Sequence, residues 1–444
     1  MRGFLVLSLT LAGACTLLAC GHDAESPAQT ASLLPVALDR LPEAAQCSEC
    51  HPVVVGKWLR HGMADALGEI EVGRTAAAPS KTWVEHAASG LRYRVEADPS
   101  GAWILAQELV TLVPGLPPPR REIPLRARIG AGVQDTAFAA VEQGRWFFSP
   151  LEFMRGAGWV HAPFQQIGNG SGLNFRITAD CLGCHTDAAL PHPFPAHDLQ
   201  DLPLRGISCA ACHGDASAHL RRMRGAESVR DGEDFGVLNP SDLPAARQLD
   251  LCARCHLEGD ALLDLQPPPS APWKPGEDLL ARRAVLVARD PGPQPAFVSQ
   301  VQRLTLSACF RGSPEMSCTT CHDPHLPPRL QPRERQISAC MECHAELQHP
   351  SLDAAATTRD CIACHMPQVE PFDLPGARIA DHWIRKQPVP IVGSNEFREH
   401  ESPEGNWETF HYRDGDPSSL TPRGLEFLRA MALAEHDSTA PVAD

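Results

Sequence analysis

Residues 209–220 read CAACHGDASAHL, and the pentapeptide that opens this stretch decides how the chain is expected to fold. The same pattern, Cys-x-x-Cys-His, occurs seven times in the 444 residues. The copies begin at Cys47, Cys181, Cys209, Cys252, Cys318, Cys340 and Cys361. They use 14 of the 17 cysteines, so this pattern dominates the cysteine chemistry of the chain. It is the attachment signature of a covalently bound c-type haem.

The spacing within the motif suits haem attachment. Two thiols three residues apart reach the two vinyl groups on one porphyrin edge and become thioethers, while the adjacent histidine ligates the iron. The sequence therefore predicts seven covalently attached c-type haems. The predicted thioether cysteines are Cys47, Cys50, Cys181, Cys184, Cys209, Cys212, Cys252, Cys255, Cys318, Cys321, Cys340, Cys343, Cys361 and Cys364, and the predicted proximal iron ligands are His51, His185, His213, His256, His322, His344 and His365.

Two other uses of paired cysteines are weaker explanations of the pattern. Zinc sites also use Cys-x-x-Cys pairs, but they do not require a histidine directly after every second cysteine. Disulfides fit less well, because this spacing is typical of redox-active thiols rather than of a structural framework.

The composition predicts a fold that is mainly α-helical with much irregular structure. Aromatic residues make up 6% of the chain and there are 42 prolines, so the polypeptide is poor in core-forming residues for its length. Haem planes can supply the missing apolar area while short helices and loops wrap them. Residues 90–109 and 136–154 alternate around the turn sequences DPSG and EQGR. They predict two hairpins in a small β-rich insertion near the N-terminus.

The motifs divide the chain into successive parts. The predicted divisions are a signal peptide at 1–19, a lipidated cysteine and flexible spacer at 20–46, a first haem segment at 47–70, the β-rich insertion at 71–178, a six-haem core at 179–385, and a tail at 386–444 with a terminal helix that begins at Thr421.

The N-terminal residues predict export. Arg2 precedes an apolar run that ends at Cys20 and is short for a transmembrane span. Residues 17–20, LLAC, resemble a bacterial lipobox, so we expect a periplasmic or outer-membrane-tethered lipoprotein whose membrane contact is the lipid on Cys20. Ordinary signal cleavage and an uncleaved anchor remain alternatives. The net charge of −15 argues against nucleic acid and favours basic redox partner proteins in the envelope.

The sequence resembles the multihaem cytochrome c-552/4 type family, some members of which carry tetratricopeptide repeats after the haem region. The resemblance rests on GISCAACHGDASAHL at 206–220, CTTCHDPH at 318–325, DCIACHMP at 360–367 and DHWI at 381–384. It spans roughly Cys47 to Trp383. No repeat array follows, because only the tail remains beyond Trp383.

The resemblance implies which histidines complete the coordination of the irons. The implied distal ligands are His219, His325 and His382, followed by His61 and His349. Further candidates for the remaining two positions are His86, His161, His192 and His197. A histidine outside a motif is ordinarily a solvated surface residue, but two imidazoles per haem is a demand that this histidine-rich chain can meet.

These observations favour an electron carrier over an enzyme. Mostly bis-histidine haems have no open iron position, and we expect no catalytic residues. The alternative is a multihaem oxidoreductase with one open haem that acts on a small nitrogen or sulfur compound. The sequence contains no Cys-x-x-Cys-Lys motif, so it gives no sign of a catalytic haem ligated by lysine. Its two tyrosines, Tyr93 and Tyr412, do not lie near a motif in the sequence, so it gives no sign of a tyrosine-modified haem either. The leftover Cys309 is expected to be a small buried hydrophobic residue.

Overall fold

A computed structural model describes most of the chain. The described residues are 36–110, 116–163, 172–177, 179–187, 202–225, 236–265, 273–346, 360–387 and 407–413, with isolated positions between 423 and 430. The predicted signal peptide and lipobox, His192, His197, His349 and the start of the predicted terminal helix at Thr421 lie outside these residues. Among the described residues, no helix has the length and apolar character needed to cross a membrane.

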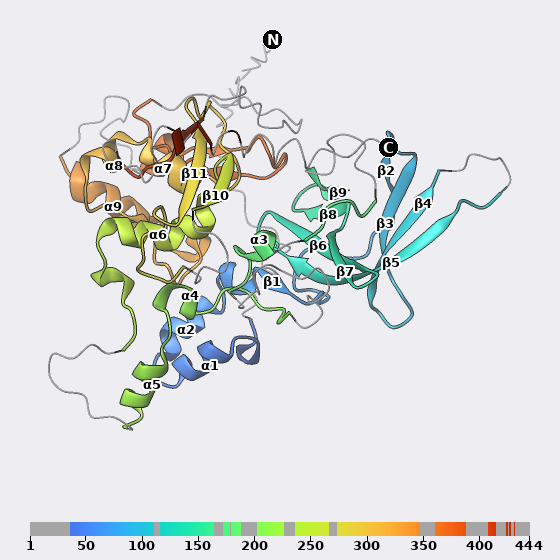
Figure 1. Cartoon of the computed structure of the whole chain (residues 1–444), viewed down its shortest axis with the longest axis horizontal. Helices are drawn as coiled ribbons and strands as arrows, with labels where there is room; N and C mark the ends of the chain where they lie inside the picture. Colours follow the sequence, from blue (N-terminus) through green and yellow to red (C-terminus); the bar gives the residue numbers. More distant parts are fainter. Residues whose placement is uncertain are drawn as a thin grey trace, which may run out of the picture.

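The prediction of a mainly α fold is wrong, because strands and helices contribute similar numbers of the described residues. Nine antiparallel strands form one sheet in the N-terminal half, which lies on the right in Figure 1. Its strands are β1 (Leu67–Gly68), β2 (Val84–His86), β3 (Leu91–Ala97), β4 (Trp103–Leu109), β5 (Arg120–Ile129), β6 (Asp135–Glu142), β7 (Arg145–Phe148), β8 (Leu151–Met154) and β9 (Gly158–His161).

The two predicted hairpins exist, but they are parts of this larger sheet. β3 pairs with β4 around the DPSG turn, and β6 pairs with β7 around Gln143 and Gly144. Both turn residues have positive φ, which suits a tight hairpin turn. β5 adds to β4, and β8 and β9 extend the sheet beyond β6. The sheet order is β2-β3-β4-β5-β6-β8-β9.

The sheet curls into a nearly closed barrel. Its two end strands approach each other, since the rings of His86 on β2 and His161 on β9 have centroids 5.0 Å apart. Alternating residues point inward and form a core that includes Tyr93, Leu105 and Phe138. This barrel therefore encloses a hydrophobic interior made of its own side chains.

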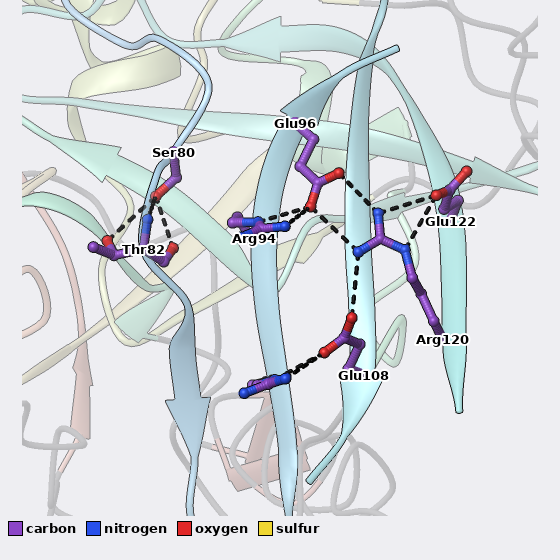
Figure 2. Close-up of polar contacts among 8 residues, drawn as sticks. Ser80, Thr82, Arg94, Glu96, Glu108, Arg120 and Glu122 are labelled. Atoms are coloured by element: carbon purple, nitrogen blue, oxygen red, sulfur yellow. Dashed lines mark hydrogen bonds and ion pairs between the residues drawn. The ribbon is translucent and has the colours of Figure 1, made fainter. Parts of the chain in front are cut away.

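A network of ion pairs covers the opposite face of β3, β4 and β5, as Figure 2 shows. Arg120 bonds to Glu96 at 2.8 Å and to Glu122 at 3.0 Å, and it also pairs with Glu108. Glu108 is buried, but the other side chains of the network are partly exposed and keep this face of the sheet solvated.

Short helices and loops make up the rest of the described chain, on the left and at the bottom of Figure 1. The helices are α1 (Pro42–Ser48), α2 (Pro52–Trp58), α3 (Ala179–Leu182), α4 (Ala210–His213), α5 (Ser217–Met223), α6 (Ala245–His256), α7 (Gln300–Thr305), α8 (Ala308–Gly312), α9 (Arg333–His344) and α10 (Cys361–His365). Two small sheets lie among them, one of β10 (Ala261–Asp264), β11 (Arg283–Ala288) and β14 (Trp407–Thr409), the other of β12 (Gln368–Val369) and β13 (Ile379–Ala380).

A buried ion cluster joins the barrel to the first motif segment. Arg128 on β5 is 1% exposed and donates to the backbone oxygen of Asp65 at 2.7 Å and to its carboxylate. Arg74 donates to the same carboxylate at 2.9 Å. The backbone N–H of Gly130 also bonds to Ala66 at 2.7 Å. These contacts fix the end of β5 against the segment that follows the first motif.

Candidate haem-binding site

Each motif turns through a single helical or 3₁₀ turn, which explains why its three functional side chains lie together. The N–H of His51 bonds to the carbonyl of Cys47 at 2.8 Å, and the same bond joins His213 to Cys209 at 2.9 Å. Residues three and four apart lie on one side of such a turn. All the cysteines described are free of disulfide bonds.

A large cavity of about 5080 Å³ is lined by residues from all seven motifs. A site for one small molecule has ~300–1,000 Å³, so this cavity has room for several large groups. Within the described part of the chain, no three His, Cys, Asp or Glu side chains converge as a metal-binding cluster. The histidines that line the cavity include the seven motif histidines and His219, His325 and His382.

Three of the implied distal histidines face motif histidines across this cavity. His219 lies opposite His51 with ring centroids 6.4 Å apart, and the two rings are 24° from parallel. His325 lies opposite His213 at 6.0 Å and 13°. Two imidazoles that bind one iron from opposite sides, each with its nitrogen about 2 Å from the metal, have ring centres roughly 6 Å apart. Both pairs fit this requirement.

The third pair joins His382 to His322, with ring centroids 6.2 Å apart and planes 35° apart. Asp381, next to His382, holds Arg303 in a two-fold ion pair with distances of 2.9 and 2.7 Å, and both side chains are 1% exposed. The Ser307 hydroxyl donates to the carbonyl of His382 at 3.1 Å. The buried ion pair and this hydrogen bond fix the position of the histidine.

Local structure explains how His219, six residues after the histidine of the third motif, reaches the first motif. α4 ends at Gly214, whose φ of +68° lies in the left-handed region that glycine favours. The chain then turns into α5, and Asp215 accepts a hydrogen bond from the N–H of Ser217 at 2.9 Å. His219 on α5 is thereby directed toward His51 and away from its own motif histidine.

Hydrogen bonds at Nδ1 orient several of the rings. His213 Nδ1 lies 2.9 Å from the carbonyl of Leu238, and His365 Nδ1 lies 2.6 Å from that of Arg385. A ligating histidine typically donates one ring N–H in this way and binds metal through the other nitrogen. His61 differs, because its Nδ1 accepts the N–H of Met63 at 3.1 Å and its proton is left on Nε2.

Burial favours the neutral imidazole at two of the candidate distal ligands. Desolvation, with the charge of His322 as the second cause, lowers the pKa of His382 to about 4. Desolvation likewise lowers the pKa of His61 to about 4, with His256 as the next contributor. A neutral imidazole has one ring nitrogen with a lone pair, which is the form that binds iron, and in His61 this lone pair accepts the N–H of Met63.

Contacts between cysteines show which motifs are neighbours. Thiols of different motifs lie within hydrogen-bonding distance in four pairs: Cys47 with Cys209, Cys184 with Cys255, Cys252 with Cys318, and Cys340 with Cys361. Three further pairs interact electrostatically: Cys212 with Cys252, Cys212 with Cys255, and Cys321 with Cys340. The motifs therefore follow one another in space in the order first, third, fourth, fifth, sixth, seventh, with the second beside the fourth.

The remaining candidates are placed elsewhere. His86 and His161 lie on the end strands of the barrel, and their rings contact each other. Among the residues that the structure describes, no ring pair joins His344 to a second histidine. Cys309 on α8 is only half-buried and lines the cavity. Burial raises the pKa of its thiol, and Cys343 adds to this shift.

Sequence reasoning missed two groups near the motifs. Tyr412 lies beside the fourth motif, because its hydroxyl donates to Asp250 on α6 at 2.6 Å. Asp135 and Glu152, from β6 and β8, line the same cavity as the motifs. No local pattern marks either group, since each is assembled from segments that are distant in the sequence.

A model of the family described as cytochrome c554 and c-prime matches residues 164–214. This stretch contains the motifs at Cys181 and Cys209. The match supports a protein of the c-type cytochrome kind, which has covalently bound haem and a role in electron transfer. No curated protein matches the chain. No solved structure matches it either.

Proposed function

We propose that the chain is a heptahaem cytochrome that passes single electrons among closely spaced, mostly bis-histidine haems. The observation that carries this proposal is the set of three facing histidine pairs, with ring centroids 6.0–6.4 Å apart, along a cavity lined by all seven motifs. Bound haems would supply one-electron redox chemistry.

The protein's own residues would hold and tune these groups. The fourteen motif cysteines attach them, and the motif histidines ligate the irons from one side. His219, His325 and His382 ligate three of them from the other side. Buried ion pairs such as Arg303 with Asp381 set the charge near one of these pairs. The neighbour order of the motifs makes the second motif a branch and places the first and seventh at the two ends.

The proposal includes export and attachment to a membrane through Cys20. It rests on the apolar N-terminal run and the LLAC sequence, and the acidic surface favours basic redox proteins as partners. In a Gram-negative host, Cys20→Ser is expected to move the protein from the membrane fraction to the soluble periplasmic fraction. Retention in the membrane by this variant contradicts a lipid anchor.

The haem count and the spin states test the main proposal. We expect haem analysis of the purified protein to give seven haems per chain, and electron paramagnetic resonance of the oxidised protein to be dominated by low-spin ferric signals. Fewer than seven haems overturns the heptahaem assignment. A high-spin signal of about one haem equivalent in the wild type favours the alternative, an oxidoreductase with one open haem, and directs substrate screens toward nitrite and hydroxylamine.

A further inference from the structure

Two carboxyl groups lie together on the outer face of the barrel. β6 and β8 are antiparallel, and Asp135 is opposite Met154 in their register. Glu152 is two residues from Met154, so it lies on the same face as Asp135, in the diagonal position. Side chains in this relation are close enough to interact.

This face of the barrel contacts the second motif. On β8, Leu151 points into the barrel core, so Glu152 points outward. On β6, the outward-facing Ala139 belongs to the same buried cluster as Leu182, which lies between the two cysteines of the second motif. Asp135, Glu152, Cys184 and His185 all line the same cavity. The carboxyl pair therefore borders the space beside this motif.

Glu152 is buried without a partner for one of its oxygens. Its side chain is 2% exposed, and within the described residues its Oε1 has no hydrogen-bond donor. A buried carboxylate oxygen without a donor lowers the stability of the folded state, unless the carboxyl group binds a proton or a ligand. Burial, with the charge of Asp135 second, holds the pKa of Glu152 well above its usual range. Burial raises the pKa of Asp135 to about 6.

Other charged groups near this face are not among those that shift the pKa of Glu152. Arg155, just after β8, donates to the carbonyl of Gly132 at 2.8 Å. Arg378 lies in the segment that crosses the face, and its carbonyl accepts from Gln134 at 2.7 Å. Asp187, after the second motif, accepts hydrogen bonds from Ser208. The charge that acts on Glu152 is that of Asp135.

We propose that Asp135 and Glu152 form a proton-binding site whose occupancy follows the oxidation state of the haem at Cys181–His185. This inference rests on the proposed function. With haem bound, a carboxylate oxygen of the pair would take up one proton from solvent on one-electron reduction and release it to solvent on reoxidation. The cause is electrostatic, because the added electron opposes a second negative charge nearby in a site of low dielectric.

The test is a spectroelectrochemical titration of the haem-loaded protein from about pH 5 to about pH 9. We expect the midpoint potential of one haem to fall as the pH rises, by up to roughly 59 mV per pH unit, the value for one proton per electron. Glu152→Gln is expected to abolish this slope. The matched control is Glu108→Gln, a buried carboxylate on β4 that pairs with Arg92 and Arg120 and does not line the cavity. It should leave the slope unchanged.

Infrared difference spectra give a second readout that a purely structural role would not move. Reduction should produce the absorption of a protonated carboxyl group in the wild type and not in Glu152→Gln. If that variant does not fold, Asp135→Asn serves in its place. A slope that is absent in the wild type, or that persists in both variants, overturns the proposal. Such a result leaves the proposed function intact when the haem count is seven, whereas a purified protein without haem refutes both.

Discussion

The barrel and the motif region differ in what fills their interiors. The barrel packs its own side chains, and β4 alone buries Trp103 and Leu105. In the motif region, α9 and α10 carry no buried residue, although each ends in a motif histidine. These helices instead border the large cavity. The comparison teaches that the barrel folds on its own apolar residues alone, while the motif region combines smaller cores, such as that of Leu249, Val285 and Phe310, with the area that attached haems provide.

The largest expected effect comes from production of the chain without haem attachment. Without the macrocycles, helices such as α9 and α10 have no buried residue to hold them, so the motif region should be much less stable, whereas the barrel should persist. Limited proteolysis with mass spectrometry should then yield a resistant fragment that spans about residues 67–162. Equal resistance of the two regions contradicts the comparison.

Removal of one facing histidine should change a single haem. His219→Ala, His325→Ala and His382→Ala are each expected to convert one haem from low-spin to high-spin, because one axial ligand is lost. Electron paramagnetic resonance measures the spin count. The matched control is His161→Ala, whose ring pairs with His86 inside the barrel at 5.0 Å and faces no motif. The same spectral change in this control contradicts the assignment of distal ligands.

The junction between the two regions should be the most sensitive point of the barrel. Arg128→Met leaves the Asp65 carboxylate buried with a weaker set of partners. Breaking a buried ion pair in this way costs about 3–5 kcal/mol. We expect denaturant unfolding to show this loss in the transition of the barrel. A loss under 1 kcal/mol would mean that the cluster does not join the two regions.

The stability of the barrel should fall as the pH rises. Burial raises the pKa of Asp135 to about 6 in the folded state, against about 4 when unfolded. The folded chain therefore binds this proton more tightly than the unfolded chain does. Its contribution to the free energy of unfolding is complete below about pH 4 and is lost as the pH rises through about 6, by up to about 3 kcal/mol. Asp135→Asn should reduce this dependence in denaturant titrations at several pH values, and the part that remains is due to Glu152, whose pKa burial also raises. A stability that rises with pH across this window is the opposite result.

The smallest effect is expected on the charged face of the barrel that Figure 2 shows. Arg120 is 31% exposed in its side chain, and such pairs are screened by solvent. Arg120→Gln should lower the unfolding free energy by only about 0.2–1 kcal/mol. A loss comparable to that of Arg128→Met would show that the outer face matters as much as the junction.

Local chemistry was predictable from the sequence, and long-range pairing was not. The motif turns follow from residues three and four apart, and the DPSG and EQGR turns marked two hairpins. The size of the barrel was missed because β5 joins β4 across a long connection. Ile123, Leu125, Ala127 and Ile129 do alternate on β5, but Pro124 lies among them and weakens the strand pattern.

The site was predicted in the same uneven way. The family resemblance of their flanking sequences implied His219, His325 and His382 as distal ligands, and the ring of each lies opposite a motif histidine. Which motif each histidine faces depends on the fold, and the spacing does not reveal it. The carboxyl pair of Asp135 and Glu152 was missed, because it exists only once β6 and β8 are in register.

The contact between the Cys47 and Cys209 thiols joins two segments of the chain that the ribosome synthesises at well-separated times. At typical rates of synthesis, roughly 8–30 s separate the appearance of these two residues. The barrel lies between them in the sequence, so it can close before the third motif exists. Gly206 then has to dock where any larger residue would collide with the backbone of Met63 and Ala64. Because the barrel is synthesised first, it can serve as the template against which the later segments pack.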